Sequence, residues 1–276
     1  ISMANPYPRP GSGASPCART ERAAISPVMK DRSALLLLSG SAEAQALRPD
    51  LMRLPQRLHV LAAERPRNAG SAPETGVELR RFAHTQAMAE YLQHHDIGAI
   101  LDAGHAFDGQ QATQAHGAAA LLGLPCLSLR RLPWETGARP HWHRVAAIAE
   151  ALPLIPRGAR VFSATGWASL PEYADFPGSM LLLRQTRRHD RVPPFDFVTP
   201  VFGSPPFSVA EEKALFTKLQ VDVLICRNLG GQASRSKLDA AAALGLTVLL
   251  VDPPPLPPGA PVVHTTTEAL AWARAL

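Results

Sequence analysis

The chain has 276 residues, of which 46% are hydrophobic and 18% are charged. This length allows one large α/β domain or two smaller ones, and either could bury a substantial core. The formal net charge is +5 and the sequence pI is about 9.5, an excess of positive charge that fits an anionic ligand. No RNP, zinc-finger or basic-heptad pattern is present, so we do not expect the chain to bind nucleic acid.

Cysteine spacing and apolar run length exclude further classes. Cys17, Cys126 and Cys226 are scattered and form no CxxC motif. This pattern favours a reducing compartment over a disulfide scaffold or a cysteine metal site. HExxH and comparable spacings are missing too, so no metal is predicted. No apolar stretch reaches the roughly 18 residues that a membrane span needs. We therefore expect a cytoplasmic protein that does not bind a membrane.

The first 31 residues differ from the rest of the chain. They are rich in Pro, Ser, Gly and Ala and lack the apolar core of a secretory signal. Such a segment cannot bury enough apolar surface to offset its ordering entropy. We predict a disordered N-terminal tail over 1–31.

An N-terminal α/β domain is predicted over 32–134, where short apolar runs alternate with helical patterns. The predicted strands lie at 34–38, 58–63, 97–103 and 124–130, and the predicted helices at 85–95 and 109–123. The segment 130–140 interrupts this rhythm and is a candidate hinge.

A C-terminal α/β domain is predicted over 135–276. Its predicted strands lie at 160–166, 179–185, 195–202, 221–226 and 247–253. Its predicted helices lie at 141–155, 168–175, 208–219, 233–244 and 267–276. The proline-rich connection 252–261 is expected to be stiff and extended.

Short apolar strands that alternate with helices are typical of parallel βαβ units. The predicted fold class is therefore α/β, with two Rossmann-like or flavodoxin-like domains. Each is expected to have a mainly parallel sheet flanked by helices, with a ligand cleft between the domains. Ligands of such sheets bind beyond the carboxyl ends of the strands, so the residues that follow each strand are the candidates.

Two strand ends carry small or hydroxyl residues before a helix. Gly40 and Ser41 follow the first strand, and Thr165 and Gly166 follow the strand at 160–164. Such turns let a ligand approach the backbone, and helix N-termini attract anions. The first turn is not GxGxxG, and a tight βα turn without a ligand explains it equally well.

Asp102 and His105 stand at the end of the third strand. A carboxylate and an imidazole placed there could transfer protons during a reaction. A lone histidine more often makes only a structural hydrogen bond, so both interpretations stay open.

The stretch after the strand 221–226 combines glycines with cations. It contains Arg227, Asn228, the pair Gly230–Gly231, and Lys237. Glycine permits a positive φ or a close backbone approach, and the cations could meet a phosphate. The alternative is a helix start with solvated charges. Several such strand ends in one chain favour an extended anionic ligand, which indicates a nucleotide-binding protein without naming its substrate.

These segments fall into a recognisable order. The relevant stretches are LLLLSGSAEAQAL (35–47), ILDAGHAF (100–107), RRLPW (130–134), VFSATGWASLPEY (161–173), LLLRQT (181–186), FGSPPFSVAEEKALF (202–216) and DVLICRNLGGQASRSKLDAAAALGLTVLLVDPP (222–254). In this order and spacing they resemble the precorrin-6A reductase family of cobalamin biosynthesis. The resemblance covers roughly residues 33–255. The chain departs from the family pattern at Gly104, Ala106, Ser204 and Leu229.

The resemblance implies NADPH-dependent reduction of one carbon–carbon double bond in the precorrin-6A macrocycle, giving precorrin-6B. It places Gly40, Ser41, Thr165, Gly166, Arg227, Asn228, Gly230, Gly231 and Lys237 at the cofactor. The carboxylates of the tetrapyrrole suit a basic site, so Arg184, Arg187, Arg131 and His105 are expected at the substrate. The departures leave a second hypothesis open, a nucleotide- or tetrapyrrole-binding relative without turnover.

Overall fold

The computed structural model describes residues 34–64, 75–232 and 234–276. The predicted tail over 1–31 lies outside the described residues. The described elements form two six-stranded sheets, and every recorded strand pair is parallel. The expected α/β fold with two mainly parallel sheets is confirmed.

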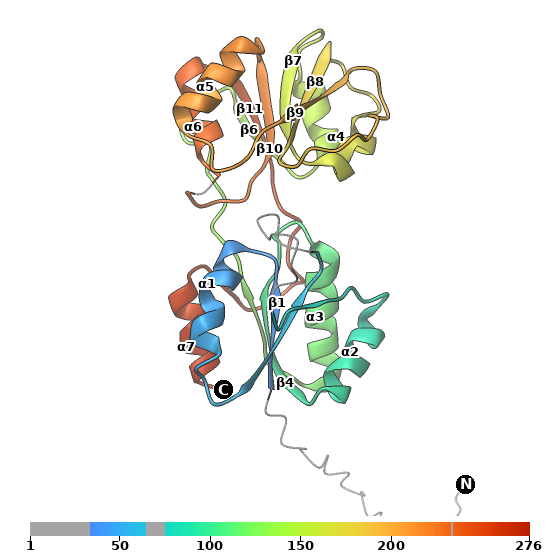
Figure 1. Ribbon diagram of the computed structural model, residues 1–276, viewed down its shortest axis with the longest axis vertical. Coiled ribbons are helices and arrows are strands. Elements are labelled where there is room, and N and C mark those ends of the chain that lie inside the picture. The colour runs from blue at the N-terminus through green and yellow to red at the C-terminus, as the bar shows by residue number, and fades with distance from the viewer. Residues whose placement is uncertain (1–33, 65–74, 233) are drawn as a thin grey trace, which may run out of the picture. The chain divides into compact units, whose positions relative to one another are not determined.

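The first sheet has the strand order β12-β5-β4-β1-β2-β3 (Figure 1). Its strands are β1 (Ala34–Ser39), β2 (Arg57–Ala62), β3 (Glu78–Leu79), β4 (Ile97–Ala103), β5 (Cys126–Leu129) and β12 (Val262–Val263). Its helices are α1 (Ala42–Leu51), α2 (Thr85–His94), α3 (Gly109–Leu122) and α7 (Thr266–Arg274).

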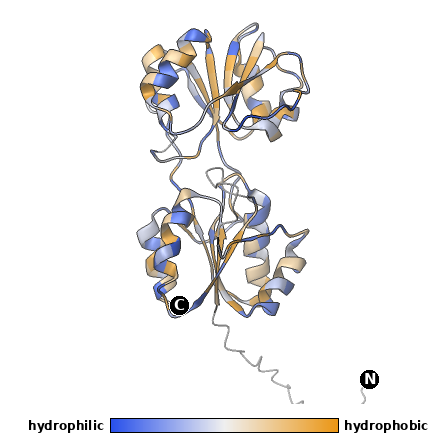
Figure 2. Ribbon diagram, viewed as in Figure 1, coloured by the Kyte–Doolittle hydropathy of each residue, from blue (hydrophilic) through white to orange (hydrophobic). Residues whose placement is uncertain are grey.

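Strand β1 shows why a continuous apolar run forms a central strand. Successive side chains point to opposite faces of a sheet. Leu35 and Leu37 join one buried cluster with α1 and α7, and Leu36 and Leu38 join another with α2 and α3. Helices therefore cover both faces, and the apolar residues of the sheet lie between them (Figure 2).

The second sheet has the order β6-β11-β10-β7-β8-β9. Its strands are β6 (Trp142–Val145), β7 (Arg160–Ala164), β8 (Met180–Gln185), β9 (Val198–Phe202), β10 (Val223–Arg227) and β11 (Thr247–Val251). Its helices are α4 (Ile148–Ala151), α5 (Val209–Lys218), α6 (Ser236–Leu244) and the 3-10 segments η1 (Leu152–Leu154) and η2 (Trp167–Tyr173). Buried apolar clusters cover both faces.

The predicted helix over 141–155 was wrong in its first half. Residues Trp142–Val145 form β6, an edge strand that pairs with β11, and α4 begins only at Ile148. Trp142 and Val145 are buried on opposite faces of the sheet, in its two apolar clusters, while Arg144 is exposed. Its partner lies about a hundred residues further along the chain, so local pattern could not reveal the pairing.

The predicted C-terminal domain over 135–276 extends too far. Strand β12 pairs with β5, and Ala269 and Ala273 of α7 are buried in the cluster that contains Leu35 and Leu37. Residues 262–276 therefore complete the first sheet and cover one of its faces. Burial of Ala269 and Ala273 removes apolar surface from water, and this favours the packing of α7 on the first sheet.

Candidate functional site

All strands within each sheet are parallel, so the loops after them lie along one edge of that sheet. Most predicted site residues stand in these loops. Asp102, Arg184 and Arg227 are within the last two residues of their strands, and Lys237 is in the first turn of α6. Some of these side chains form hydrogen bonds or ion pairs within the protein, and others lie at its surface.

The β1–α1 turn is tightly packed. A Cβ on Gly40 would lie 2.6 Å from the backbone nitrogen of His105, so glycine is required where this turn meets the loop after β4. Ser41 is the N-cap of α1, and its hydroxyl accepts a hydrogen bond from Ala44 N at 3.1 Å and donates one to Ala103 O at 2.9 Å. The Ser41 side chain is thus engaged in capping.

Asp102 is held in a buried ion pair. It is 1% exposed, pairs with Arg130 and accepts a hydrogen bond from Gly104 N at 3.0 Å. Arg130 also donates to the Asp102 carbonyl at 2.9 Å. Ser128 Oγ lies 3.3 Å from the carboxylate and 2.8 Å from His116 Nε2. Burial lowers the pKa of His116. These contacts suit a structural carboxylate better than a proton donor.

His105 stays at the rim of the same loop. Its Nδ1 accepts a hydrogen bond from Phe107 N at 3.2 Å. This bond orients the imidazole, and the ring is only partly buried. Gly104 beside it would place a Cβ 3.0 Å from Asp102 Oδ1, which explains a small residue at this position.

Thr165 lies within a buried hydroxyl network. Its Oγ1 is 2.7 Å from Ser169 Oγ, 2.9 Å from Ser163 Oγ and 3.1 Å from Tyr173 Oη. Burial raises the pKa of Tyr173 to about 12, so the phenol stays protonated at neutral pH. The network links the end of β7 to η2, and the Thr165 side chain is buried.

Gly166 and Arg227 lie next to each other at the surface of this edge. Gly166 has φ +94°, a conformation that favours glycine. The nearest atom to a Cβ placed there would be Arg227 Nη2, at 4.0 Å. The Arg227 guanidinium also lies over the Phe107 ring, 4.9 Å from its centroid. The Arg227 guanidinium therefore lies beside the Gly166 backbone.

Asn228 joins two segments of the chain. The side chain is 1% exposed. Its Oδ1 accepts from Trp134 N at 2.7 Å, and its Nδ2 donates to Trp134 O at 3.0 Å and to Asp252 Oδ1 at 2.7 Å. These bonds use both donors of the amide, so the predicted hydrogen bond to a cofactor has a protein partner instead.

Gly230 and Gly231 approach the hinge segment. Both have positive φ, and a Cβ on Gly230 would lie 2.1 Å from Leu132 O. A Cβ on Gly231 would lie 3.0 Å from Arg131 Cδ. The predicted close approach exists, and the group that approaches is the chain's own backbone. Lys237 nearby donates to Ser234 O at 2.6 Å and lies 5.7 Å from the Trp134 ring centroid.

The predicted substrate arginines have different surroundings. Arg131 forms a two-pronged ion pair with Glu43, at 2.5 and 2.7 Å. Arg184 pairs with Glu212 at 2.5 Å, and these side chains are only 8% and 4% exposed. Arg187 is exposed in the loop after β8. Of these three residues, Arg187 is the exposed one.

Sequence reasoning missed Trp134. Its backbone N and O both hydrogen-bond the Asn228 side chain, and its Nε1 donates to Gly231 O at 2.8 Å. The signal was present in RRLPW, a buried-type aromatic within an otherwise polar hinge. Its role is not visible in the sequence because its partners lie about a hundred residues away along the chain.

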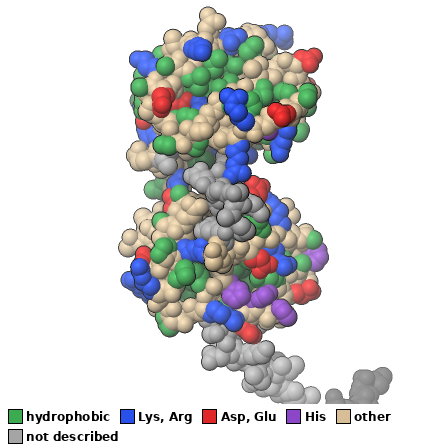
Figure 3. Space-filling view, viewed as in Figure 1, with side chains coloured by type: hydrophobic (Ala, Val, Ile, Leu, Met, Phe, Trp, Pro, Cys, Tyr) green, Lys and Arg blue, Asp and Glu red, His purple; other side chains and the backbone are tan. Residues whose placement is uncertain are grey.

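Histidines gather over α2 and the neighbouring strand β2 (Figure 3). The His59 and His95 ring centroids are 5.3 Å apart, and those of His94 and His95 are 5.0 Å apart. Among the described residues, no group of His, Cys, Asp and Glu has the arrangement needed to hold a metal ion. Every helix in the described ranges is too short or too polar to cross a membrane.

Comparison with known proteins extends these observations. Residues 34–274 match the family model described as Precorrin-6x reductase CbiJ/CobK. The chain belongs to this family. It is therefore an enzyme, a reductase of cobalamin biosynthesis.

Two curated relatives are similar over nearly their whole lengths. Precorrin-6A reductase of Rhodococcus erythropolis is 35% identical, over 88% of this chain and 98% of the relative. Precorrin-6A reductase of Mycobacterium tuberculosis is 31% identical, with the same coverage of both chains. A solved structure of CobK precorrin-6A reductase matches with a TM-score of 0.77 and 27% identity, over 87% of this chain and 96% of that one.

Proposed function

We propose that the chain catalyses the NADPH-dependent reduction of one carbon–carbon double bond in precorrin-6A, giving precorrin-6B, in the cytoplasm. The observation that carries this proposal is the similarity to the Rhodococcus erythropolis precorrin-6A reductase across almost the full length of both chains. The two parallel sheets support it, because such sheets bind ligands at the carboxyl ends of their strands.

The cofactor phosphates are proposed to lie at Gly166 and Arg227. Within the described ranges, the Arg227 guanidinium is the one group that a Cβ on Gly166 would approach, at 4.0 Å. A phosphate there would gain a charge-assisted hydrogen bond from the arginine. Thr165, Asn228, Gly230 and Gly231 serve this site indirectly, by fixing the two loops that carry the pair.

The N-terminus of α1 is a second proposed contact with the dinucleotide. Helix N-termini favour anions, and Gly40 keeps the turn before α1 free of a side chain. Ser41 holds the turn in place through its bond to Ala103 O.

The bound nicotinamide supplies the hydride. The residues of this chain bind and orient the two ligands and exclude water from them. His105 and Arg187 remain candidates for substrate contact, because both side chains lie at the surface of their sheet edges. Asp102, Arg131 and Arg184 are proposed to position the loops, since each is committed to an ion pair within the protein.

A preference for NADPH over NADH is proposed from the end of β2. An acidic residue at that position usually binds the ribose hydroxyl of NADH. Here the nearest acid along the chain, Glu64, is paired with Arg81 at 3.0 Å, and Arg81 also pairs with Asp108 at 3.3 Å. An arginine beside the ribose would instead favour the extra phosphate of NADPH.

Titration of the protein with NADPH and with NADH tests this preference. Arg81→Gln should weaken NADPH binding by about tenfold, as expected for one charge-assisted bond to phosphate, and leave NADH binding nearly unchanged. Arg80→Gln is the matched control, since Arg80 is the neighbouring arginine and pairs with Glu78 instead. Equal dissociation constants for the two cofactors in the wild-type protein would contradict the proposal.

A further inference from the structure

The loop after β8 contains two exposed arginines, Arg188 and Arg191. Among the described residues, neither is paired with an acid. Their side chains lie over aromatic rings. Arg188 lies over Phe202 at 5.4 Å, and Arg191 lies over Trp167 at 6.0 Å.

A histidine links the two rings. The His189 ring lies edge-on to Trp167 at 4.7 Å and to Phe202 at 5.5 Å between centroids. Its Nε2 is 3.2 Å from Gln185 Oε1, and its Nδ1 accepts from Arg191 N at 3.2 Å. The imidazole therefore fixes the loop that carries the arginines, and each guanidinium stands over an aromatic face. Such preorganisation reduces the entropy lost when a ligand binds.

These groups share one edge of the second sheet. Trp167 follows β7, the arginines follow β8, and Phe202 ends β9. The three strands are neighbours, so their carboxyl ends are adjacent. This is the edge at which open parallel sheets bind ligands. Val192, which is 86% exposed, adds an apolar side chain to the same loop.

We propose that Arg188 and Arg191, supported by His189, Trp167 and Phe202, form the subsite that binds the carboxylate arms of the tetrapyrrole. The proposal rests on the proposed function and names the residues that select its substrate. A guanidinium binds a carboxylate through a charge-assisted bond, and the aromatic rings and Val192 offer apolar surface to the ring edge.

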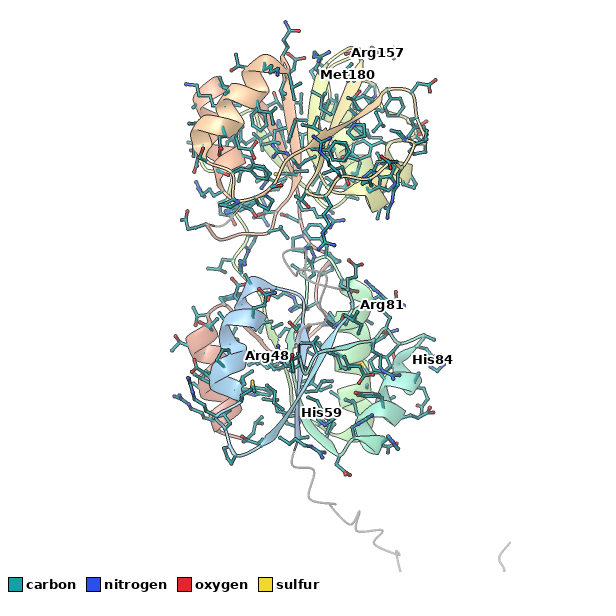
Figure 4. The ribbon with its side chains drawn as sticks, in the orientation of Figure 1. Arg48, His59, Arg81, His84, Arg157 and Met180 are labelled. Carbon is teal, nitrogen blue, oxygen red and sulfur yellow. The ribbon has the colours of Figure 1, made fainter. Side chains whose placement is uncertain are left out.

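The test is the double variant Arg188→Gln/Arg191→Gln in the full chain. Its control is Arg157→Gln/Lys218→Gln, which removes the same charge at the opposite edge. Arg157 precedes β7 and lies with Met180 at the amino ends of the strands (Figure 4), and Lys218 ends α5. Three quantities are measured: KM and kcat with precorrin-6A, Kd for NADPH, and Kd for uroporphyrin, a porphyrin with carboxylate arms, used as a binding probe.

The expected result is a rise in KM and in the uroporphyrin Kd of about tenfold per arginine, with kcat and the NADPH Kd within about twofold of wild type. The uroporphyrin affinity of the variant should also depend less on salt. Changes no larger than those of the control overturn the proposal. So does a rise in the NADPH Kd alone, because the arginines would then bind a cofactor phosphate.

The two proposals can fail separately. A wild-type protein that does not turn over precorrin-6A contradicts the proposed function. Even then, uroporphyrin binding tests the subsite. Weaker binding by Arg188→Gln/Arg191→Gln than by the control variant supports the subsite. Equal binding by these two variants, or no binding by the wild-type protein, overturns it.

Discussion

The arginines of this chain differ in burial and in partners, and these differences separate structural from surface roles. Arg184 and Glu212 form an almost fully buried pair, and Arg184 also lies over the Phe207 and Phe162 rings at 4.0 and 4.9 Å. Burial raises the pKa of Glu212, and the charge of Arg184 opposes that rise. Arg188, four residues along, is exposed. From sequence alone the two arginines look alike, because each follows an apolar strand.

Arg184→Ala should lower the free energy of unfolding by about 3–5 kcal/mol, since it leaves the Glu212 carboxyl buried without its partner. Urea unfolding measures this change. Arg157→Ala, at an exposed arginine just before β7 of the same sheet, should change stability by less than about 0.5 kcal/mol. The double variant Arg184→Met/Glu212→Gln should recover part of the loss. If Arg184→Ala were as stable as wild type and had a raised KM, Arg184 would belong to the substrate site.

At the scale of secondary structure elements, apolar pattern predicted most strands and helices. The runs that became β1, β4, β8 and β10 are short and bounded by turn residues, and they pack between two helical layers. The predictions failed where a distant partner decides the structure. Strand β6 is too short and too polar to be recognised without β11, and α7 is an ordinary amphipathic helix until its alanines meet α1.

Two substitutions in α7, one at a buried and one at an exposed alanine, test the packing of this helix on the first sheet. Ala269 is fully buried and Ala271, two residues on, is exposed. Ala269→Glu should reduce the free energy of unfolding by about 3 kcal/mol or more, because it buries a carboxyl without a partner. Ala271→Glu should change it by less than about 0.5 kcal/mol. Thermal and urea unfolding measure both. Equal effects of the two substitutions would contradict the packing of this helix.

At the scale of the whole molecule, sequence located the loops of the candidate site better than the roles within them. The predicted residues do lie at or just beyond the carboxyl ends of the strands of the two sheets. Thr165, Asn228 and Gly230 then proved to contact the protein itself, through a hydroxyl network, Trp134 and Leu132. Residue type and position indicate where a ligand can bind. They do not reveal whether a polar atom already has a buried partner, because that depends on contacts far apart in sequence.

The proposed reaction transfers a hydride from NADPH to the precorrin-6A ring. The most direct measurement is mass spectrometry of the product formed from precorrin-6A and NADPH deuterated at the transferable position of the nicotinamide. The expected product is heavier than the substrate by one deuterium and one hydrogen, and it forms only when protein, cofactor and substrate are all present. Unchanged substrate with the folded, cofactor-bound protein, or a reduced product without deuterium from either face of the nicotinamide, would contradict it.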